Sequence, residues 1–124
     1  VLTFGAQSQS LAETSWTVVS YNNGNEAVVS VKIGTELTAT FTESGAVAGS
    51  AGCNNYTGTY ETDGANISVG PMAATMKMCI DEETMVQEGQ FLAAMETAAT
   101  FSIEGSKLQF RTADGAMAVT FTAK

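Results

Sequence analysis

Histidine is absent from this chain of 124 residues, and cysteine, proline and tryptophan are scarce. Without histidine, the chain cannot build Ser-His-Asp or Cys-His catalytic groups, or any zinc site that includes histidine. Basic residues are also few, with 5 against 13 acidic ones, and the net charge is -8. A chain with this charge does not bind phosphate backbones or anionic lipid by bulk electrostatics. We therefore expect no nucleic-acid partner.

Long apolar runs are also missing, since none approaches the roughly 20 residues that a membrane-spanning helix needs. The length suits a single domain with one core. Residues 1–10 are mostly small and polar, so we expect a tether there and one domain over 11–124. The chain starts at Val1 rather than Met and displays no signal-peptide pattern. We therefore expect a leader that was removed upstream, where a lipid anchor would also lie.

Cysteine occurs twice, at Cys53 and Cys79. An even number of cysteines in a small acidic chain fits one disulfide in an oxidising compartment. The alternative is two buried free thiols in a cytosolic protein. A disulfide here would close a loop of about 25 residues and, in the chain-entropy model, stabilise the fold by roughly 3 kcal/mol. We favour the disulfide, and with it an extracellular, periplasmic or outer-membrane-associated location.

Alternation of apolar and polar residues with period two predicts antiparallel β-structure. It is clearest over 37–42 and 117–122, where apolar residues alternate mainly with threonine. Turn dipeptides separate the alternating stretches and predict tight hairpins; they are Asn23-Gly24, Ser44-Gly45, Asp63-Gly64, Glu104-Gly105 and Asp114-Gly115. The pattern predicts a mainly β (α+β) fold, a compact, twisted antiparallel sheet or barrel-like domain with one packed helix.

One segment, 82–98, has helical instead of alternating spacing. Its apolar residues at that spacing are Met85, Phe91, Leu92 and Met95. Asp81 suits the N-cap, and the acidic residues after it suit the positive end of the helix dipole. Gly89 weakens a helix by about 1 kcal/mol, so we expect it where the backbone packs closely on the sheet.

The apolar sides of the strands and the helix are expected to form one core. The candidates are Trp16, Val18, Val31, Ile33, Leu37, Phe41, Ile67, Val69, Phe91, Leu92, Phe101, Ile103, Leu108, Phe110, Val119 and Phe121. We expect the aromatic residues to serve packing rather than to form a stacking platform for a ligand.

The segment 49–60 is the least ordinary stretch of the sequence, because glycines crowd Cys53 and two asparagines follow it. Asn54, Asn55 and Tyr56 are the candidate polar surface or loop residues, which could line a site for a polar ligand. The plainer interpretation, which we favour, is a bent or bulged strand, because glycine permits positive φ and asparagine satisfies turn backbone.

Two further segments suggest metals but have simpler explanations. The segment 71–79 contains three methionines and a cysteine, a soft-metal pattern that suits copper(I). Methionine also fills irregular gaps in cores, which we favour. The acidic run 81–83 lacks the spaced ligands of a calcium loop and suits a helix start better. We predict no catalytic residue, no metal site and no cofactor.

These residues also form an ordered set of motifs. The order is Gly52-Cys53-Asn54-Asn55-Tyr56-x-Gly58, then Met72-Ala73-x-Thr75-x-x-Met78-Cys79, then Glu88-x-x-Phe91-Leu92. Over residues 11–122 the chain resembles the META domain family of HslJ-like proteins. The resemblance implies a small, mostly β domain with a packed helix and a disulfide between the two cysteines. It also implies an envelope or secreted location and a link to stress, but no enzymatic activity.

We therefore expect a non-enzymatic secreted or cell-envelope domain, associated with stress or with the envelope, that binds another protein or an envelope component. One alternative is a small-ligand carrier with a pocket in a barrel-like fold. Another is a protease inhibitor, which would present a rigid exposed loop within 49–58, stiffened by the disulfide.

Overall fold

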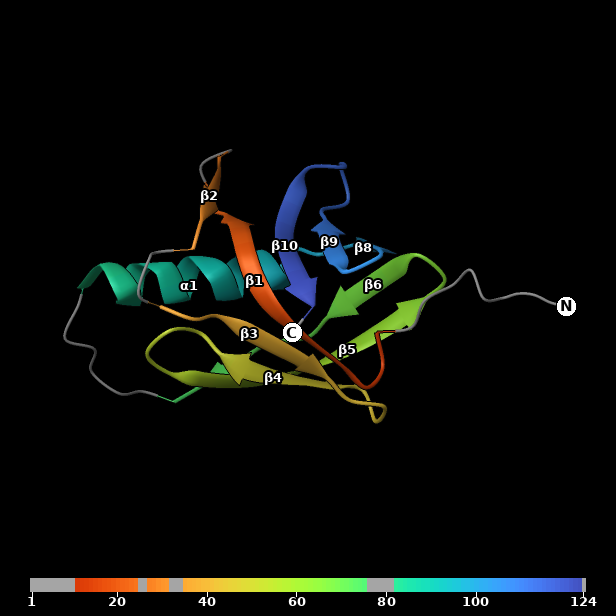
Figure 1. Cartoon of the computed structure of the whole chain (residues 1–124), viewed down its shortest axis with the longest axis horizontal. Coiled ribbons are helices and arrows are strands. Elements are labelled where there is room, and N and C mark those ends of the chain that lie inside the picture. The colour runs from red at the N-terminus through yellow and green to blue at the C-terminus, as the bar shows by residue number, and fades with distance from the viewer. Residues whose placement is uncertain (1–10, 25–26, 32–34, 76–81, 124) are drawn as a thin grey trace, which may run out of the picture.

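The computed structural model describes residues 11–24, 27–31, 35–75 and 82–123. Within these ranges the chain forms ten strands and one helix (Figure 1). The elements in chain order are β1 (Thr14–Asn22), β2 (Val28–Ser30), β3 (Thr38–Phe41), β4 (Ala46–Ser50), β5 (Asn55–Asp63), β6 (Asn66–Val69), β7 (Ala73–Ala74), α1 (Glu82–Glu96), β8 (Thr100–Glu104), β9 (Lys107–Arg111) and β10 (Met117–Ala123).

Eight of the strands close into an antiparallel barrel, which confirms the mainly β, barrel-like fold expected from the sequence. Their order is β10-β9-β8-β6-β5-β4-β3-β1, and the ring closes because β1 also pairs with β10. The two remaining strands are short additions, β2 on β1 and β7 on β5. Closure removes the long unpaired edges that an open sheet of this size would expose.

The five predicted turns all join strands that pair with each other, so these hairpin predictions are confirmed. Each turn glycine has a positive φ, a conformation that side chains with a Cβ rarely adopt. The glycines and angles are Gly24 (86°), Gly45 (93°), Gly64 (63°), Gly105 (61°) and Gly115 (91°).

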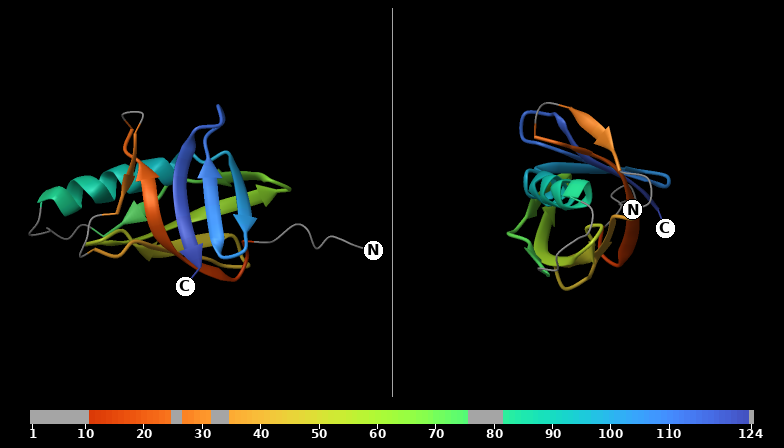
Figure 2. Two further views of the ribbon diagram at one scale, coloured as in Figure 1. Left: turned by 45° about the horizontal axis from the view of Figure 1, so that its top comes forward. Right: turned by 90° about the vertical axis from the view of Figure 1, so that its left-hand side faces the viewer.

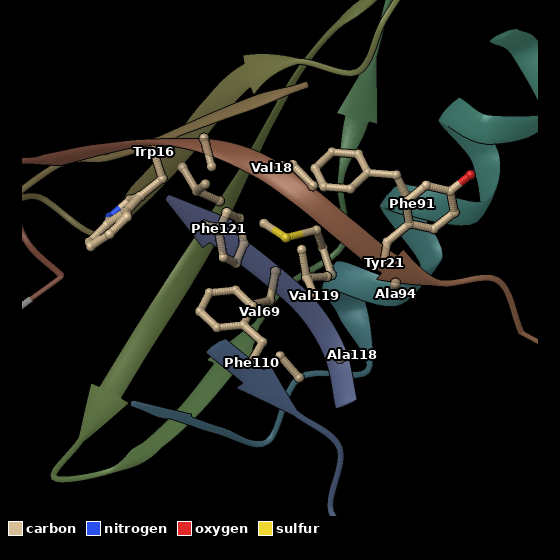
Figure 3. Packing of buried hydrophobic residues seen from close by; sticks show 14 of the residues in the cluster. Trp16, Val18, Tyr21, Val69, Phe91, Ala94, Phe110, Ala118, Val119 and Phe121 are labelled. Carbon is tan, nitrogen blue, oxygen red and sulfur yellow. The ribbon is translucent and has the colours of Figure 1, made fainter. Parts of the chain in front are cut away.

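The space inside the ring is filled by the chain's own side chains, as Figure 3 shows for part of it. Four aromatic pairs meet edge to face at ring-centroid distances of 4.9–6.0 Å. Such pairs contribute about 0.5–1.5 kcal/mol beyond the area that they bury. The pairs are Phe41–Tyr60, Phe41–Phe110, Phe110–Phe121 and Tyr56–Phe91.

Most of the predicted core is buried. The confirmed residues are Trp16, Val18, Leu37, Phe41, Ile67, Val69, Phe91, Leu108, Phe110, Val119 and Phe121. Those that are only partly buried are Val31, Leu92, Phe101 and Ile103, and Ile33 lies outside the described residues. Bulges explain local breaks in the alternation: one in β10 lets both Ala118 and Val119 face the core, and one in β1 leaves Val19 exposed.

The helix α1 packs against β1, β10 and β6. Seen from its end in Figure 2, it lies between the two sides of the ring of strands. It ends two residues before the predicted limit of 98, because the amides of Thr97 and Ala98 donate to carbonyls only three residues earlier. The expected N-cap, Asp81, lies outside the described residues.

One expectation about the helix is wrong. Gly89 does not pack on the sheet: it is exposed, and a Cβ at this position would meet no atom within 4 Å outside its own helix backbone. Met85, one of the apolar residues at helical spacing, is 40% exposed. The cause is the rotation of the helix, which buries Thr84, Gln87 and Glu88 in its first half.

Candidate functional site

The most polar buried site of the described chain surrounds the carboxylate of Glu88, on the inner face of α1. Its Oε2 accepts hydrogen bonds from the backbone amides of Cys53 (3.2 Å) and Asn54 (2.8 Å). Its Oε1 accepts one from Nδ2 of Asn54 at 2.7 Å. Three donors on a buried carboxylate compensate for the water that it loses, and such charge-assisted bonds are about twice as strong as neutral ones.

The donors come from the turn 51–54, which joins β4 to β5. The amide of Ala51 donates to the carbonyl of Asn54 at 2.8 Å and closes the turn. Gly52 has a φ of 114°, and a Cβ there would lie 3.2 Å from Cγ2 of Thr84. Only glycine suits both this backbone angle and this close approach of the turn to the helix.

A second set of bonds continues from Asn54 to β7. Its Oδ1 accepts a hydrogen bond from the hydroxyl of Thr75 at 2.8 Å. The same hydroxyl oxygen accepts the amide of Asn55 at 3.2 Å, and the amide of Thr75 donates to the carbonyl of Asn55 at 3.0 Å. Glu88, Asn54 and Thr75 thus form one network, here called the Glu88 network, that is buried at Glu88 and Asn54 and reaches the surface at Thr75. It ties the helix to the turn before β5 and to the residue after β7.

The structure corrects the polar surface expected at residues 54–56. Asn55 is exposed, but Asn54 and Tyr56 are only 4% and 1% exposed. Asn54 turns inward because Glu88 receives its side chain, and Tyr56 because it packs on Phe91 and donates its hydroxyl to the carbonyl of Thr38 at 2.6 Å. The stretch 49–60 is a hairpin of β4 and β5 rather than one bent or bulged strand, although the positive φ expected of its glycines is found at Gly52.

The Glu88 network and the neighbouring Tyr56 hold the fold together. The carboxylate is occupied by three donors, and burial raises the pKa of Tyr56 above the ordinary tyrosine value of 10.0. A phenol in that state is a poor acid or base near neutral pH. Within the described ranges no three His, Cys, Asp or Glu side chains could together hold a metal ion.

Two sequence expectations depend on residues 76–81, which lie outside the described residues. They are the pairing of Cys53 with Cys79 and the soft-metal pattern of the segment 71–79. The disulfide between Cys53 and Cys79 therefore stays a prediction. The interpretation of the acidic run 81–83 as a helix start is confirmed, because α1 begins at Glu82 and carries Glu82 and Glu83 in its first turn.

A second feature, which the sequence analysis missed, lies on the surface between the β1–β2 hairpin and α1. A groove of about 470 Å³ is lined there by Tyr21, Val29 and Ser30 on one side and by Val86, Gln90, Gln87, Glu82 and Glu83 on the other. We call it the β2–α1 groove. Val86 is 56% exposed, because the polar residues beside it occupy the buried face of the helix.

Comparison with known proteins supports the fold. A protein from Burkholderia xenovorans solved by NMR has a TM-score of 0.75 and 25% identity, and the match covers 96% of this chain and 87% of that one. A crystal structure of a DUF4847-family protein from Bacteroides vulgatus has a TM-score of 0.63 and 15% identity, with 92% and 94% covered. No curated protein matches the chain.

The sequence itself matches a family model. The META domain model covers residues 9–124, which is more than nine-tenths of the chain. The match includes the turn 51–54, the helix and all the described strands. Among the described helices, none combines the length and the apolar character that crossing a bilayer requires.

Proposed function

The chain belongs to the META domain family, and on that premise we propose that it is a non-enzymatic binding module of the cell envelope or the secreted space. The observation that carries this proposal is the filled interior of the barrel. Its largest fully buried side chains are Tyr56, Phe41, Phe91, Phe110 and Phe121. A barrel filled in this way offers its outer surface, rather than its interior, for recognition.

The buried polar groups support the same conclusion. The carboxylate of Glu88 and the side chain of Asn54 hold the helix to the turn 51–54 and are buried, with 8% and 4% exposed. Catalytic acids and bases need access to a substrate. Glu88 and Asn54 are buried and lack that access, which favours binding over catalysis.

The two alternative functions are less well supported by the geometry. A small-ligand carrier needs a cavity inside the ring, where aromatic side chains lie instead. A protease inhibitor needs a protruding loop, but Ala51 and Asn54 of the turn are 0% and 4% exposed.

Photocrosslinking tests the binding function. A photoreactive residue is placed in turn at Val19, Asn55 and Met85, which are exposed and lie on different elements. We expect a saturable crosslink to an envelope or secreted component from at least one position, abolished by an excess of unlabelled domain. The proposal fails if no position gives a product that the excess domain suppresses.

The location is tested separately by the two cysteines. Intact mass after alkylation under denaturing conditions, with and without prior reduction, reports whether they form a disulfide. We expect no alkylation before reduction and two alkyl groups after it, as an oxidising compartment requires. Free alkylation of protein isolated from its native compartment without reductant would overturn the envelope or secreted location.

A further inference from the structure

We propose that the β2–α1 groove binds an extended segment of a partner protein that carries alternating apolar and basic side chains. This inference rests on the proposed binding function and specifies the partner. Its first support is the apolar floor. Tyr21 and Val29 face each other across β1 and β2, and Val86 lies opposite them on the helix. Tyr21 is already buried, so the apolar surface that a partner would remove from water, the main driving force of association, is that of Val29 and Val86.

The second support is the edge of β2. The amide of Val31 donates to the carbonyl of Val19, and the amide of Asn23 donates to the carbonyl of Ala27. In an antiparallel pair, alternate residues bond to the partner strand and the residues between them face away. The backbone groups of Val28 and Ser30 therefore point away from β1, in the arrangement to which an extended peptide can add a strand.

The third support is charge. Glu82 and Glu83 line the groove in the first turn of α1, and no basic residue is among the described residues that line it. Two carboxylates outweigh the roughly half positive charge of a helix N-terminus. The whole chain carries a net charge of -8. Complementarity therefore favours lysine or arginine in the partner and opposes an acidic one.

The length of the bound segment follows from β2. This strand has three residues and runs across the axis of α1 rather than along it, as Figure 1 shows. A segment added to its edge therefore crosses the helix and pairs over only a few residues. A second hollow of about 310 Å³ adjoins the groove at Gln90, which lines both. The surface therefore fits a short linear segment.

A displayed peptide library tests the chemistry of the partner. Random peptides of about eight residues are selected on the intact domain, and the enriched ones are synthesised for binding measurements by fluorescence anisotropy. We expect enrichment of apolar residues alternating with lysine or arginine, and binding that weakens as salt rises. Enrichment of acidic peptides, or of none, would overturn the proposal.

Matched variants test the position of the site. Val86→Lys introduces a charge at the groove, and Val19→Lys introduces the same charge at a valine outside it that is 48% rather than 56% exposed. We expect binding of the selected peptide to weaken at least about tenfold, or roughly 1.4 kcal/mol, in the first variant. We expect less than about a twofold change in the second. Equal effects would place the peptide elsewhere.

A second pair of variants changes the side chains less, so that a loss of binding does not reflect a folding defect. Glu82→Gln removes one charge from the groove, and Glu104→Gln removes one from the exposed end of β8. Only the first should weaken binding and flatten its dependence on salt. Crosslinking from Met85 then separates the two proposals. If a partner crosslinks equally well to the wild type and to Val86→Lys, the binding function stands but the groove is not the binding site. If no position gives a crosslinked partner, the binding function itself is refuted.

Discussion

The two halves of α1 are held to the barrel by different forces. The second half buries Phe91, Ala94 and Met95 among apolar neighbours. The first half buries Thr84, Gln87 and Glu88. Polar side chains at buried positions are stable only when they are hydrogen-bonded. The first half therefore depends on specific partners, and the second half on packing.

The consequence of this difference is visible on the surface. Because polar residues occupy the inner face of the first half, its apolar residues Met85 and Val86 lie outside, 40% and 56% exposed. A helix with an ordinary amphipathic pattern would bury them. This placement of polar residues inside and apolar residues outside gives the β2–α1 groove its apolar wall. The Glu88 network and the proposed binding surface therefore lie on opposite faces of the same half of α1.

The largest effect is expected from breaking the packed half. Phe91→Ala removes a fully buried ring that meets Tyr56 edge to face at 5.6 Å. We expect a loss of about 3–5 kcal/mol in the free energy of unfolding, as for other large-to-small changes in cores. Urea denaturation measures it. Leu92→Ala, at a half-buried position on the same turn, should lose clearly less, and an equal loss would contradict the assignment of Phe91 to the core.

Breaking the polar half should have a smaller but still large effect. Glu88→Ala leaves two backbone amides and the side chain of Asn54 without their acceptor, and we expect a loss of about 2–3 kcal/mol. Glu88→Gln keeps one acceptor and should lose less. The control is Glu96→Gln, which alters an exposed residue with one bond to the amide of Met72. If Glu88→Gln unfolds at the same urea concentration as Glu96→Gln and the wild type, the Glu88 network does not stabilise the fold.

Tyr56 packs on Phe91 of the second half, and its hydroxyl provides a pH-dependent test. Tyr56→Phe removes the bond to the carbonyl of Thr38 and should cost about 1 kcal/mol at neutral pH. Burial raises the pKa of Tyr56, so the unfolded chain loses this proton near pH 10 while the folded chain keeps it. Stability is therefore fully present below pH 10 and falls above it.

The decline with pH should be shallower in Tyr56→Phe than in the wild type, because the phenol responsible is gone. It should not vanish, since burial also raises the pKa of Tyr21 and Tyr60. Urea denaturation between pH 8 and 11 measures the slope. Tyr60→Phe is the matched control, with a similar bond to the carbonyl of Thr42 but a more exposed ring. If the stability of Tyr56→Phe falls with pH as steeply as that of the wild type, the Tyr56 phenol does not cause the decline.

The strands were predictable because their information is local. In β3 and the residue before it, Leu37, Ala39 and Phe41 alternate with threonines, and all three are fully buried. The turn glycines sit between such stretches, where a positive φ is needed. Each of these patterns is complete within a few residues, so no knowledge of the rest of the fold is required.

The Glu88 network could not be predicted in the same way, because its partners are 34 and 35 residues apart in the chain. Nothing local says that a glutamate will meet the amides of a distant turn. One signal was available, however. Counting back from Phe91 by three, four and seven residues gives Glu88, Gln87 and Thr84, which is the buried face. Apolar residues at helical spacing do not define this face on their own, since one of them, Met85, is exposed.

Gly89 lies at the boundary between the two halves, and changing it should have the smallest effect, in the opposite direction. Gly89→Ala should raise the free energy of unfolding by about 0.5–1 kcal/mol, because alanine restricts the unfolded chain and favours helix. The added Cβ meets no atom within 4 Å. Thermal and urea denaturation measure the gain. Gly49→Ala is the control, since its Cβ would collide with the carbonyl of Thr38 and must destabilise the barrel. If Gly89→Ala is also destabilising, a close contact exists at Gly89, and the helix is not open to solvent where its two halves meet.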